Sequence, residues 1–513
     1  MRPDRRKFIK NTICAALGGA SVYSALGQLQ LLQAATRATN YAFNDYKALI
    51  CVFLYGGNDS FNTVVPYTTS AFNSFYGANG VRPQLGLDRT LLHSLSDPTG
   101  SSNDGIQYAL HPLMPELQAL FNTGKAAIVA NTGTLVGKMT QADYQAGIKA
   151  LPPQLYSHSD QSAYWQSSPP SNSPATGWGG RIADLVAAGQ PGYPILTGIN
   201  GGDFFTRGQD VNGYIMNADG ATTLNPPYAP GMQASFDALY AGGTQANALE
   251  RTYAATMNHS AATSGIINAA LAAARPAGGG NPAGDPRNSI FKNYFLNPSG
   301  YDLDSQLQAV AELIWAANNN LPGYAGLTRQ VFFVSTGGYD THSDELAQHG
   351  TNAGNPGILG MLSKSLAGFY TALNSVGLAS KATAFTASDF GRTMTSNNGG
   401  SDHGWGSHQF VVGGAVNGGK FYGNGCGFPA GQQAANYGLV MPSLVNPTQL
   451  PNVYDASPNF NDPGDGYGRI IPTTSVDQYA ATLASWFGLS ASDIDLIFPN
   501  LAPNFSIRNL GFV

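Results

Sequence analysis

The sequence is poor in charge and has no long apolar run beyond its N-terminal region. Only 11% of its 513 residues are charged, and the formal net charge is −5. No cluster of basic residues occurs, which argues against nucleic-acid binding by electrostatic attraction. No later segment offers roughly 18 apolar residues in a row, so we expect no transmembrane helix in the mature chain.

Cysteine is also scarce, with three residues at Cys14, Cys51 and Cys426. Three cysteines cannot form the disulfide framework of a small secreted domain. Cys14 lies in the N-terminal segment, which leaves one possible pair in the mature chain. Cys51 lies within an apolar, strand-like run, and this position favours a buried free thiol over a disulfide.

The N-terminus has the features of an export signal. Arg5 and Arg6 are followed by Phe8, Ile9 and Lys10 and then by a mildly apolar stretch. This arrangement resembles a twin-arginine signal, so residues 1–38 are left out of the fold prediction. We expect the twin-arginine translocase to deliver a folded protein to the periplasm or the exterior.

Short apolar runs that end in glycine or a small polar residue recur along the chain. They lie at 48–55, 126–131, 193–200, 330–335 and 383–388, and helix-length segments lie at 111–124, 248–276, 303–320 and 357–377. This alternation predicts an α/β fold with a mainly parallel sheet and helices on both faces. We expect one domain over residues 45–513, with long loop excursions near 275–288 and 424–470.

Metal-ligand and acid–base side chains follow several of these runs. Asp59, Asp340, His342 and Asp389 each come within a few residues of the end of an expected strand. Loops at the carboxyl ends of parallel strands gather at one edge of a sheet, where ligands bind. Mixed aspartate and histidine ligands favour Zn²⁺ or Mn²⁺, with Ca²⁺ or Mg²⁺ as alternatives.

Ordered motifs along most of the chain carry a family resemblance. They are LYGGNDSFNTVVP, YSHSDQSAYW, STGGYDTH, SDFGRT, GSDHGWGSHQFVVGGAVNGGKFYG and IIPTTSVDQYAATLASWFGLSASDIDLIFPNL. Together they resemble the domain-of-unknown-function 1501 family. That family is similar to the alkaline phosphatase and sulfatase superfamily. The resemblance implies an alkaline phosphatase-like wound sheet and a metal-dependent hydrolase of phosphate or sulfate esters.

The superfamily pattern also suggests roles for individual residues. It implies metal ligands at Asp59, Asp340, His342, Asp389 and His403. It implies a nucleophile at a helix N-terminus, where Ser157 is the first candidate and Ser159 and Ser60 are the alternatives. His158 and Arg392 are the further catalytic candidates, with Arg392 expected to clamp an anion or to brace Asp389.

Two features depart from the superfamily pattern. Phe390 follows Asp389 where a histidine is usual, so a second metal would lose a ligand unless Asp402 or His408 replaces it. The nucleophile region also lacks the cysteine that formylglycine sulfatases modify. The alternative function is therefore a non-catalytic exported protein that keeps the fold for binding or surface assembly.

Overall fold

The computed structural model describes residues 41–423 and 467–513, except for 79, 103–104, 171–173, 191–194, 202, 212, 224–230, 242–246, 296–301 and 353. The expected export signal and Cys426 lie outside the described residues. Cys51 is buried in the first strand as a free thiol, as expected from its apolar surroundings.

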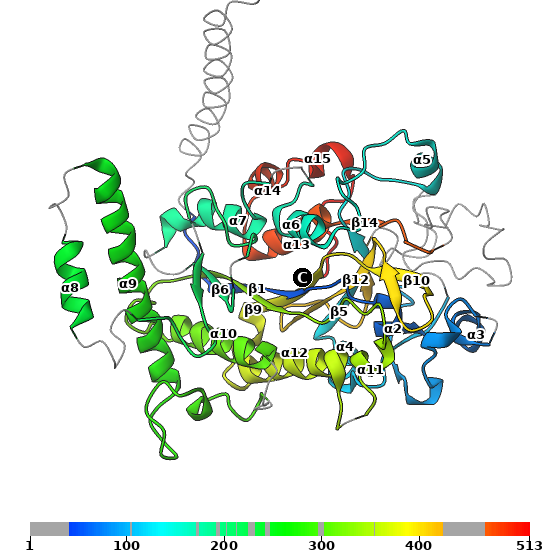
Figure 1. Ribbon diagram of the computed structural model, residues 1–513, viewed down its shortest axis with the longest axis horizontal. Helices are drawn as coiled ribbons and strands as arrows, with labels where there is room; N and C mark the ends of the chain where they lie inside the picture. The colour runs from blue at the N-terminus through cyan, green and yellow to red at the C-terminus, as the bar shows by residue number, and fades with distance from the viewer. Residues whose placement is uncertain are drawn as a thin grey trace, which may run out of the picture.

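A nine-stranded sheet forms the centre of the protein (Figure 1). Its order is β13-β5-β12-β9-β1-β8-β6-β7, and β14 pairs with β5. The strands are β1 (Lys47–Leu54), β5 (Ala126–Gly133), β6 (Leu196–Ile199), β7 (Tyr214–Met216), β8 (Arg329–Thr336), β9 (Ala382–Ser388), β12 (Ser407–Gly413), β13 (Phe421–Tyr422) and β14 (Thr474–Ser475). Within this sheet as described, β12 alone runs antiparallel to its neighbours. The expected mainly parallel α/β sheet is thus present, and β12 separates β5 from the other long strands.

Helices cover both faces of this sheet. On one side are α4 (Pro115–Asn122), α10 (Asp302–Asn318), α11 (Glu345–His349) and α12 (Gly357–Ser375); on the other are α6 (His158–Ser167), α7 (Trp178–Val186), α13 (Val476–Phe487), α14 (Ala491–Ile497) and α15 (Leu501–Asn504) (Figure 1). Every residue of β9 is buried, and so is every residue of β1 after Lys47. This burial on both faces explains why these strands are continuous apolar runs without alternation.

Smaller elements surround the sheet. They are α2 (Ser60–Thr63), β2 (Val64–Pro66), α3 (Thr69–Tyr76), β3 (His93–Ser94), β4 (Tyr108–Leu110), α5 (Gln141–Ala146), β10 (Arg392–Ser396) and β11 (Ser401–His403). β10 and β11 pair as an antiparallel hairpin in which Arg392 lies opposite His403. The glycine-rich stretch that follows β9 therefore forms a hairpin that folds back toward the end of the sheet.

Three neighbouring strands end together and place the candidate residues. β1 lies between β8 and β9, and Leu54 is in register with both Thr336 and Ser388. The segments that follow these strands begin at Tyr55, Gly337 and Asp389. Because all three strands are parallel, these segments meet at the carboxyl edge of the sheet, as expected.

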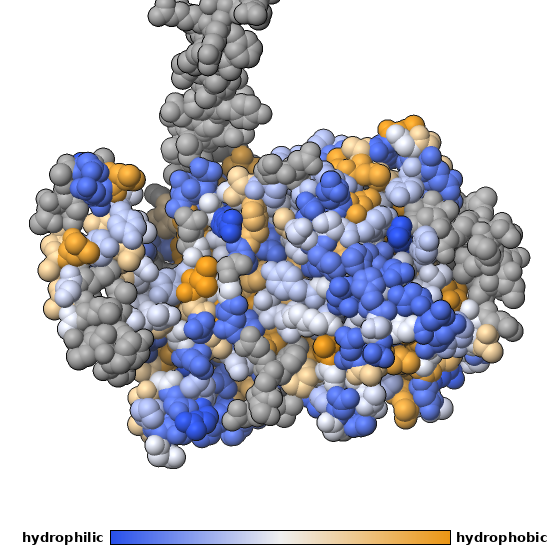
Figure 2. Space-filling model, viewed as in Figure 1, coloured by the Kyte–Doolittle hydropathy of each residue, from blue (hydrophilic) through white to orange (hydrophobic). Residues whose placement is uncertain are grey.

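Two helices lie at one end of the molecule, and the second of them packs its C-terminal part, with buried Ile267 and Leu271, against the core. α8 (Met232–Leu239) and α9 (Ala248–Ala274) form an arm at the left of Figure 1. Exposed apolar residues on this arm include Leu239, Leu249 and Tyr253. The view in Figure 2 is otherwise largely hydrophilic, with small scattered apolar groups. Within the described residues, no helix combines the length and the apolar character needed to cross a membrane.

Candidate metal centre

Close backbone contacts at the carboxyl edge depend on glycine. Gly56 has a φ of +118°, and a Cβ atom there would lie 2.3 Å from the backbone nitrogen of Asp340. A Cβ on Gly400 would lie 2.2 Å from the carbonyl oxygen of Thr341. Since any side chain would push these segments apart, the glycines let the loops after β1 and β8 and the β10–β11 hairpin lie against one another.

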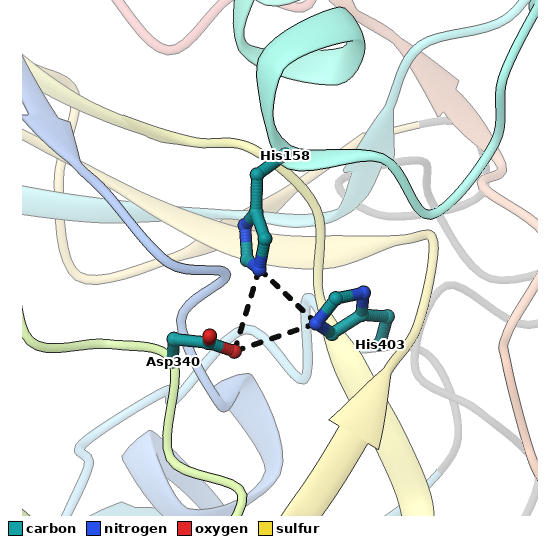
Figure 3. Close-up of side chains that lie close together, drawn as sticks. All are labelled: His158, Asp340 and His403. Carbon is teal, nitrogen blue, oxygen red and sulfur yellow. Dashed lines mark hydrogen bonds and ion pairs between the residues drawn. The ribbon is translucent and has the colours of Figure 1, made fainter.

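Three side chains from distant segments converge at this edge. His158 begins α6, Asp340 follows β8 and His403 ends β11, and all three point toward one another (Figure 3). The Nε2 atoms of His158 and His403 lie 3.1 Å apart, and each lies 3.4 Å from Oδ1 of Asp340. The side chains remain 34%, 25% and 48% exposed for His158, His403 and Asp340, so a substrate can reach them.

Hydrogen bonds at the opposite ring nitrogens orient both histidines. Nδ1 of His158 lies 2.7 Å from Oδ2 of Asp389, and Nδ1 of His403 lies 2.8 Å from the carbonyl oxygen of Tyr156. Both partners are acceptors, so in each neutral ring Nδ1 carries the proton and Nε2 presents a lone pair to the centre. A bond of this kind behind each ring is the usual support of a metal-binding histidine.

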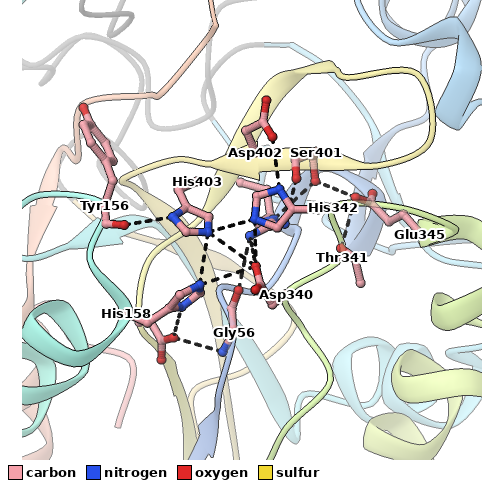
Figure 4. Close-up of polar contacts among 12 residues, drawn as sticks. Gly56, Tyr156, His158, Asp340, Thr341, His342, Glu345, Ser401, Asp402 and His403 are labelled. Carbon is pink, nitrogen blue, oxygen red and sulfur yellow. Dashed lines mark hydrogen bonds and ion pairs between the residues drawn. The ribbon is translucent and has the colours of Figure 1, made fainter.

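His342 lies at the edge of the same group (Figure 4). Its Nε2 is 2.9 Å from Nε2 of His403 and 3.1 Å from Oδ1 of Asp340. Its Nδ1 is 3.0 Å from Oδ1 of Asp402, which also accepts from the side chain of Asn397. Asp402, a candidate replacement ligand from the sequence, therefore supports His342 from behind.

Asp389 and Arg392 hold other residues in place. Asp389 accepts from Ser162 Oγ and from the backbone nitrogen of Gly56, in addition to His158. Arg392 is fully buried and donates to Oδ1 of Asp340 at 2.9 Å, and to the carbonyl oxygens of Gly56 and Ser401. Arg392 thus braces Asp340 and not Asp389, and its bonds leave it poorly placed to clamp a substrate anion.

The surroundings shift the pKa values of these groups in different directions. The hydrogen bond that His158 donates to Asp389, and the charges of Asp389 and Asp340, raise the pKa of His158 despite its partial burial. Burial, followed by the positive charges of His158 and Arg392, lowers the pKa of His403. Burial favours a raised pKa for Asp340, but the hydrogen bond and charge of Arg392 outweigh it and lower that pKa. Without a metal, a proton on His158 Nε2 would therefore bridge the two rings.

The remaining catalytic candidate lies at the start of α6. Ser157 is the N-cap residue of this helix, but its side chain makes no capping hydrogen bond. Its hydroxyl instead donates to Oδ2 of Asp160 at 2.5 Å and lies 3.3 Å from the hydroxyl of Ser159. Phe390, the departure noted in the sequence, packs its ring 4.7 Å from the rings of both His158 and His403.

Asp59 does not join this centre but belongs to a second, buried cluster. Its carboxylate oxygens accept hydrogen bonds from both terminal nitrogens of Arg82, at 3.1 and 2.9 Å. Oxygen and nitrogen atoms of Asp59, Glu345 and His349 lie within 4.8 Å of one another. His408, the other candidate replacement ligand, is buried, and its Nδ1 accepts from the backbone nitrogen of Asn131. In this position it contributes a metal ligand to neither cluster.

The buried cluster holds its groups in unusual protonation states. Burial and the charge of Asp59 raise the pKa of Glu345, whereas Arg82 keeps the pKa of Asp59 low despite its burial. Burial lowers the pKa of His349 to about 4, so its ring is neutral near pH 7. Glu345 and His349 were missed as a pair, although their spacing of four residues in α11 puts them on one helical face.

Comparison of the sequence with models of protein families assigns the chain to a family. A family model described as "Protein of unknown function (DUF1501)" matches residues 46–446. The chain belongs to this family. The matched range carries every residue of the candidate metal centre and every strand of the central sheet except β14. No curated protein matches the chain.

Proposed function

We propose that this DUF1501 protein is an exported metal-dependent hydrolase of phosphate or sulfate esters, with its metal held by His158, Asp340 and His403. The main support is the spacing of the three ligand atoms. Atoms that lie about 2.0–2.1 Å from a tetrahedral Zn²⁺ ion are about 3.3 Å apart, close to the 3.1–3.4 Å found here. Two histidines and one carboxylate suit Zn²⁺ or Mn²⁺ better than Ca²⁺ or Mg²⁺.

Three protein ligands and an accessible side are typical of catalytic rather than structural zinc sites. A bound ion would supply Lewis-acid stabilisation of the charge that develops on the ester oxygens. His342 borders this side and is the candidate fourth ligand, in which case the substrate oxygen would bind as a fifth ligand. Asp389 and Tyr156 fix the ring orientation of His158 and His403, and Arg392 fixes Asp340, so little reorganisation is needed when the metal binds.

Ser157 is the proposed nucleophile. Its hydroxyl donates to Asp160, a carboxylate that can take the proton as the serine attacks. The N-terminus of α6 offers backbone N–H groups and partial positive charge to an anionic ester group. Because Arg392 is engaged with Asp340, we assign binding of the substrate anion to the metal and to this helix N-terminus.

Metal content and hydrolysis test this proposal together. The exported protein should contain Zn²⁺ or Mn²⁺ and cleave p-nitrophenyl phosphate or p-nitrophenyl sulfate. Dialysis against a chelator should abolish the cleavage, and the metal should restore it. The Asp340→Asn variant should lose both metal and activity. If the protein contains metal at this centre but cleaves neither ester, the hydrolase assignment is wrong.

That result would favour the second candidate, a non-catalytic exported binding or surface-assembly protein. Phe390 is the observation in its favour, because it occupies the position where the superfamily usually supplies a further metal ligand. The ring packs against His158 and His403 and offers no ligand for a second ion.

Export and the relation to the alkaline phosphatase superfamily are also part of the proposal. Arg5, Arg6 and the residues after them support a twin-arginine signal and a periplasmic or extracellular location. The carboxyl-edge position of Asp340 and Asp389, and the helix-start position of Ser157, agree with the superfamily pattern. The placement of Asp59 departs from that pattern.

A further inference from the structure

An unpartnered histidine lies in the buried cluster around Asp59, beneath the candidate metal centre. Neither ring nitrogen of His349 has a hydrogen-bond partner among the described residues, although this side chain is completely buried. A buried polar group without a partner costs roughly 1–3 kcal/mol, so the unpartnered ring of His349 points to a bound species at one of its nitrogens.

The geometry around His349 fits a cation. A ligand nitrogen of His349 and carboxylate oxygens of Asp59 and Glu345 lie within 4.8 Å of one another. An ion at the centre of a triangle with sides of at most 4.8 Å would be no more than about 2.8 Å from each atom, close to the 2.0–2.6 Å range of metal–ligand distances in proteins. His349 touches neither carboxylate directly, as expected if an ion lies between them.

Hydrogen bonds hold the two carboxylates to their neighbours and to each other. Oδ1 of Asp59 accepts from Arg82 and from the backbone nitrogen of Phe61, and Oδ2 accepts from Arg82. Oε2 of Glu345 accepts from the hydroxyls of Thr341 and Ser401, and Oε1 has a longer contact to Arg82, at 3.5 Å. The carboxyl groups of Glu345 and Asp59 are also hydrogen-bonded to each other. An ion at this place would replace the proton that the two carboxyl groups share.

Charge balance also calls for one more positive charge. Two buried carboxylates face the single guanidinium of Arg82. A buried charge without a counter-charge is strongly unfavourable, so either a proton or a cation must complete the cluster. The unpartnered nitrogens of His349 favour the cation, because a proton shared by the carboxylates would leave them unsatisfied.

We propose that Asp59, Glu345 and His349 bind a second divalent ion of the Zn²⁺ or Mn²⁺ class, buried and structural, separate from the accessible centre at His158. The position of this buried ion in the fold indicates its role. Glu345 is bonded to Thr341, which lies between Asp340 and His342, and to Ser401, two residues before His403. The ion would fix the two segments that carry the accessible site. This inference does not depend on the proposed function.

Metal analysis of the full exported chain tests the proposal. We expect two equivalents of metal per chain in the wild type. Glu345→Gln and His349→Gln should each lose one equivalent and keep the one at the accessible centre. His158→Gln should show the reverse loss. If the function proposed above is wrong but this inference is right, the wild type will keep one equivalent that survives His158→Gln and is lost in His349→Gln.

Glu345→Gln separates a cation from a proton. Gln has the shape and hydrogen-bonding capacity of a protonated Glu345, so a cluster completed by a proton should tolerate it. Unchanged metal content and melting temperature in this variant would overturn the proposal. With a cation, we expect Glu345→Gln to lower the melting temperature and to abolish the stabilisation that added Zn²⁺ or Mn²⁺ gives the chelated wild type.

A crystal structure of the wild type settles the matter if the variants fail to fold. Anomalous diffraction above the Zn or Mn absorption edge should show a peak between Asp59, Glu345 and His349. Density there without an anomalous signal would identify an ordered water and exclude the ion.

Discussion

Nε2 of His158 lies 3.1 Å from Nε2 of His403, while the other nitrogen of each ring is bonded to an acceptor. Two lone pairs therefore face each other across a short distance, beside a carboxylate oxygen. Such an arrangement is stable only with a proton or a metal ion between the rings. Proton and metal compete for the same atoms, and each prediction about this centre follows from that competition.

The first prediction concerns the ligands and their supports. His158→Gln and His403→Gln should each remove the accessible metal, because each deletes a nitrogen ligand. Asp389→Asn should keep the site but weaken metal binding about 10–100-fold, since it removes the charge that supports the ring of His158. Metal titration of the chelated protein measures these effects.

His93→Gln is the matched control, because this half-buried histidine is bonded to the carbonyl oxygen of Pro112 away from the centre. If Asp389→Asn binds metal like the wild type, Asp389 does not support a ligand and the proposed centre is wrong.

The second prediction concerns Arg392. Arg392→Gln should lower the free energy of unfolding by about 2–3 kcal/mol, because it leaves the carbonyl oxygens of Gly56 and Ser401 without their donor and removes the partner of the half-exposed Asp340 carboxylate. Denaturation in urea measures this loss. Arg287→Gln is the control: this exposed residue pairs with Asp285, and its replacement should cost no more than about 1 kcal/mol. Equal losses in both variants would contradict the bracing role of Arg392.

The sheet could be predicted from the sequence because its signal is local. Buried parallel strands are continuous apolar runs, and β1, β8 and β9 ended within a residue or two of the expected positions. The antiparallel direction of β12 was not predicted. It depends on the return of the chain through the β10–β11 hairpin, which apolar periodicity does not encode.

The site could be predicted only in part, because the side chains that contact one another in it come from segments far apart in the sequence. The carboxyl-edge rule indicated Asp340, His342 and Asp389, but it could not distinguish a residue that faces the centre from one that lies behind it. Asp59 is an example. It follows β1 as expected, but its carboxylate forms an ion pair with Arg82 and belongs to a separate cluster. Nothing in the sequence near Arg82 marks it as that partner.

The third prediction concerns acid stability. Burial lowers the pKa of His111 and of His408 to about 3. Between pH 6.5 and 3 the unfolded chain binds protons at these histidines and the folded chain does not. As the pH is lowered through this window, the free energy of unfolding should therefore decrease, by about 1.4 kcal/mol per pH unit for each histidine.

Urea denaturation at several pH values, in the presence of a chelator, measures this slope. His408→Asn retains an acceptor for the backbone nitrogen of Asn131 but removes the titrating ring, so its slope should be shallower than that of the wild type. An unchanged slope would show that another group causes the acid sensitivity.

The fourth prediction concerns export. Replacement of both Arg5 and Arg6 by lysine should leave the precursor in the cytoplasm, because the paired guanidinium groups are the expected recognition element of the translocase. Cell fractionation and immunoblotting measure the distribution. Lys10→Arg is a matched control that preserves charge outside the arginine pair. Normal accumulation of the double variant outside the cytoplasm would count against the twin-arginine assignment.

The last prediction concerns the nucleophile. Ser157 and Ser159 flank His158, but only the hydroxyl of Ser157 makes a short bond to Asp160; that of Ser159 lies 3.5 Å away. Ser157→Ala should therefore reduce turnover of p-nitrophenyl phosphate or sulfate at least 1,000-fold and leave metal content unchanged, an order of magnitude expected for a nucleophile with its own base. Ser159→Ala should retain activity within about tenfold. A rapid burst of p-nitrophenolate in the wild type would indicate a covalent serine ester. If Ser157→Ala remains active, the attacking group is water at the metal, and Ser157 serves only to orient the start of α6.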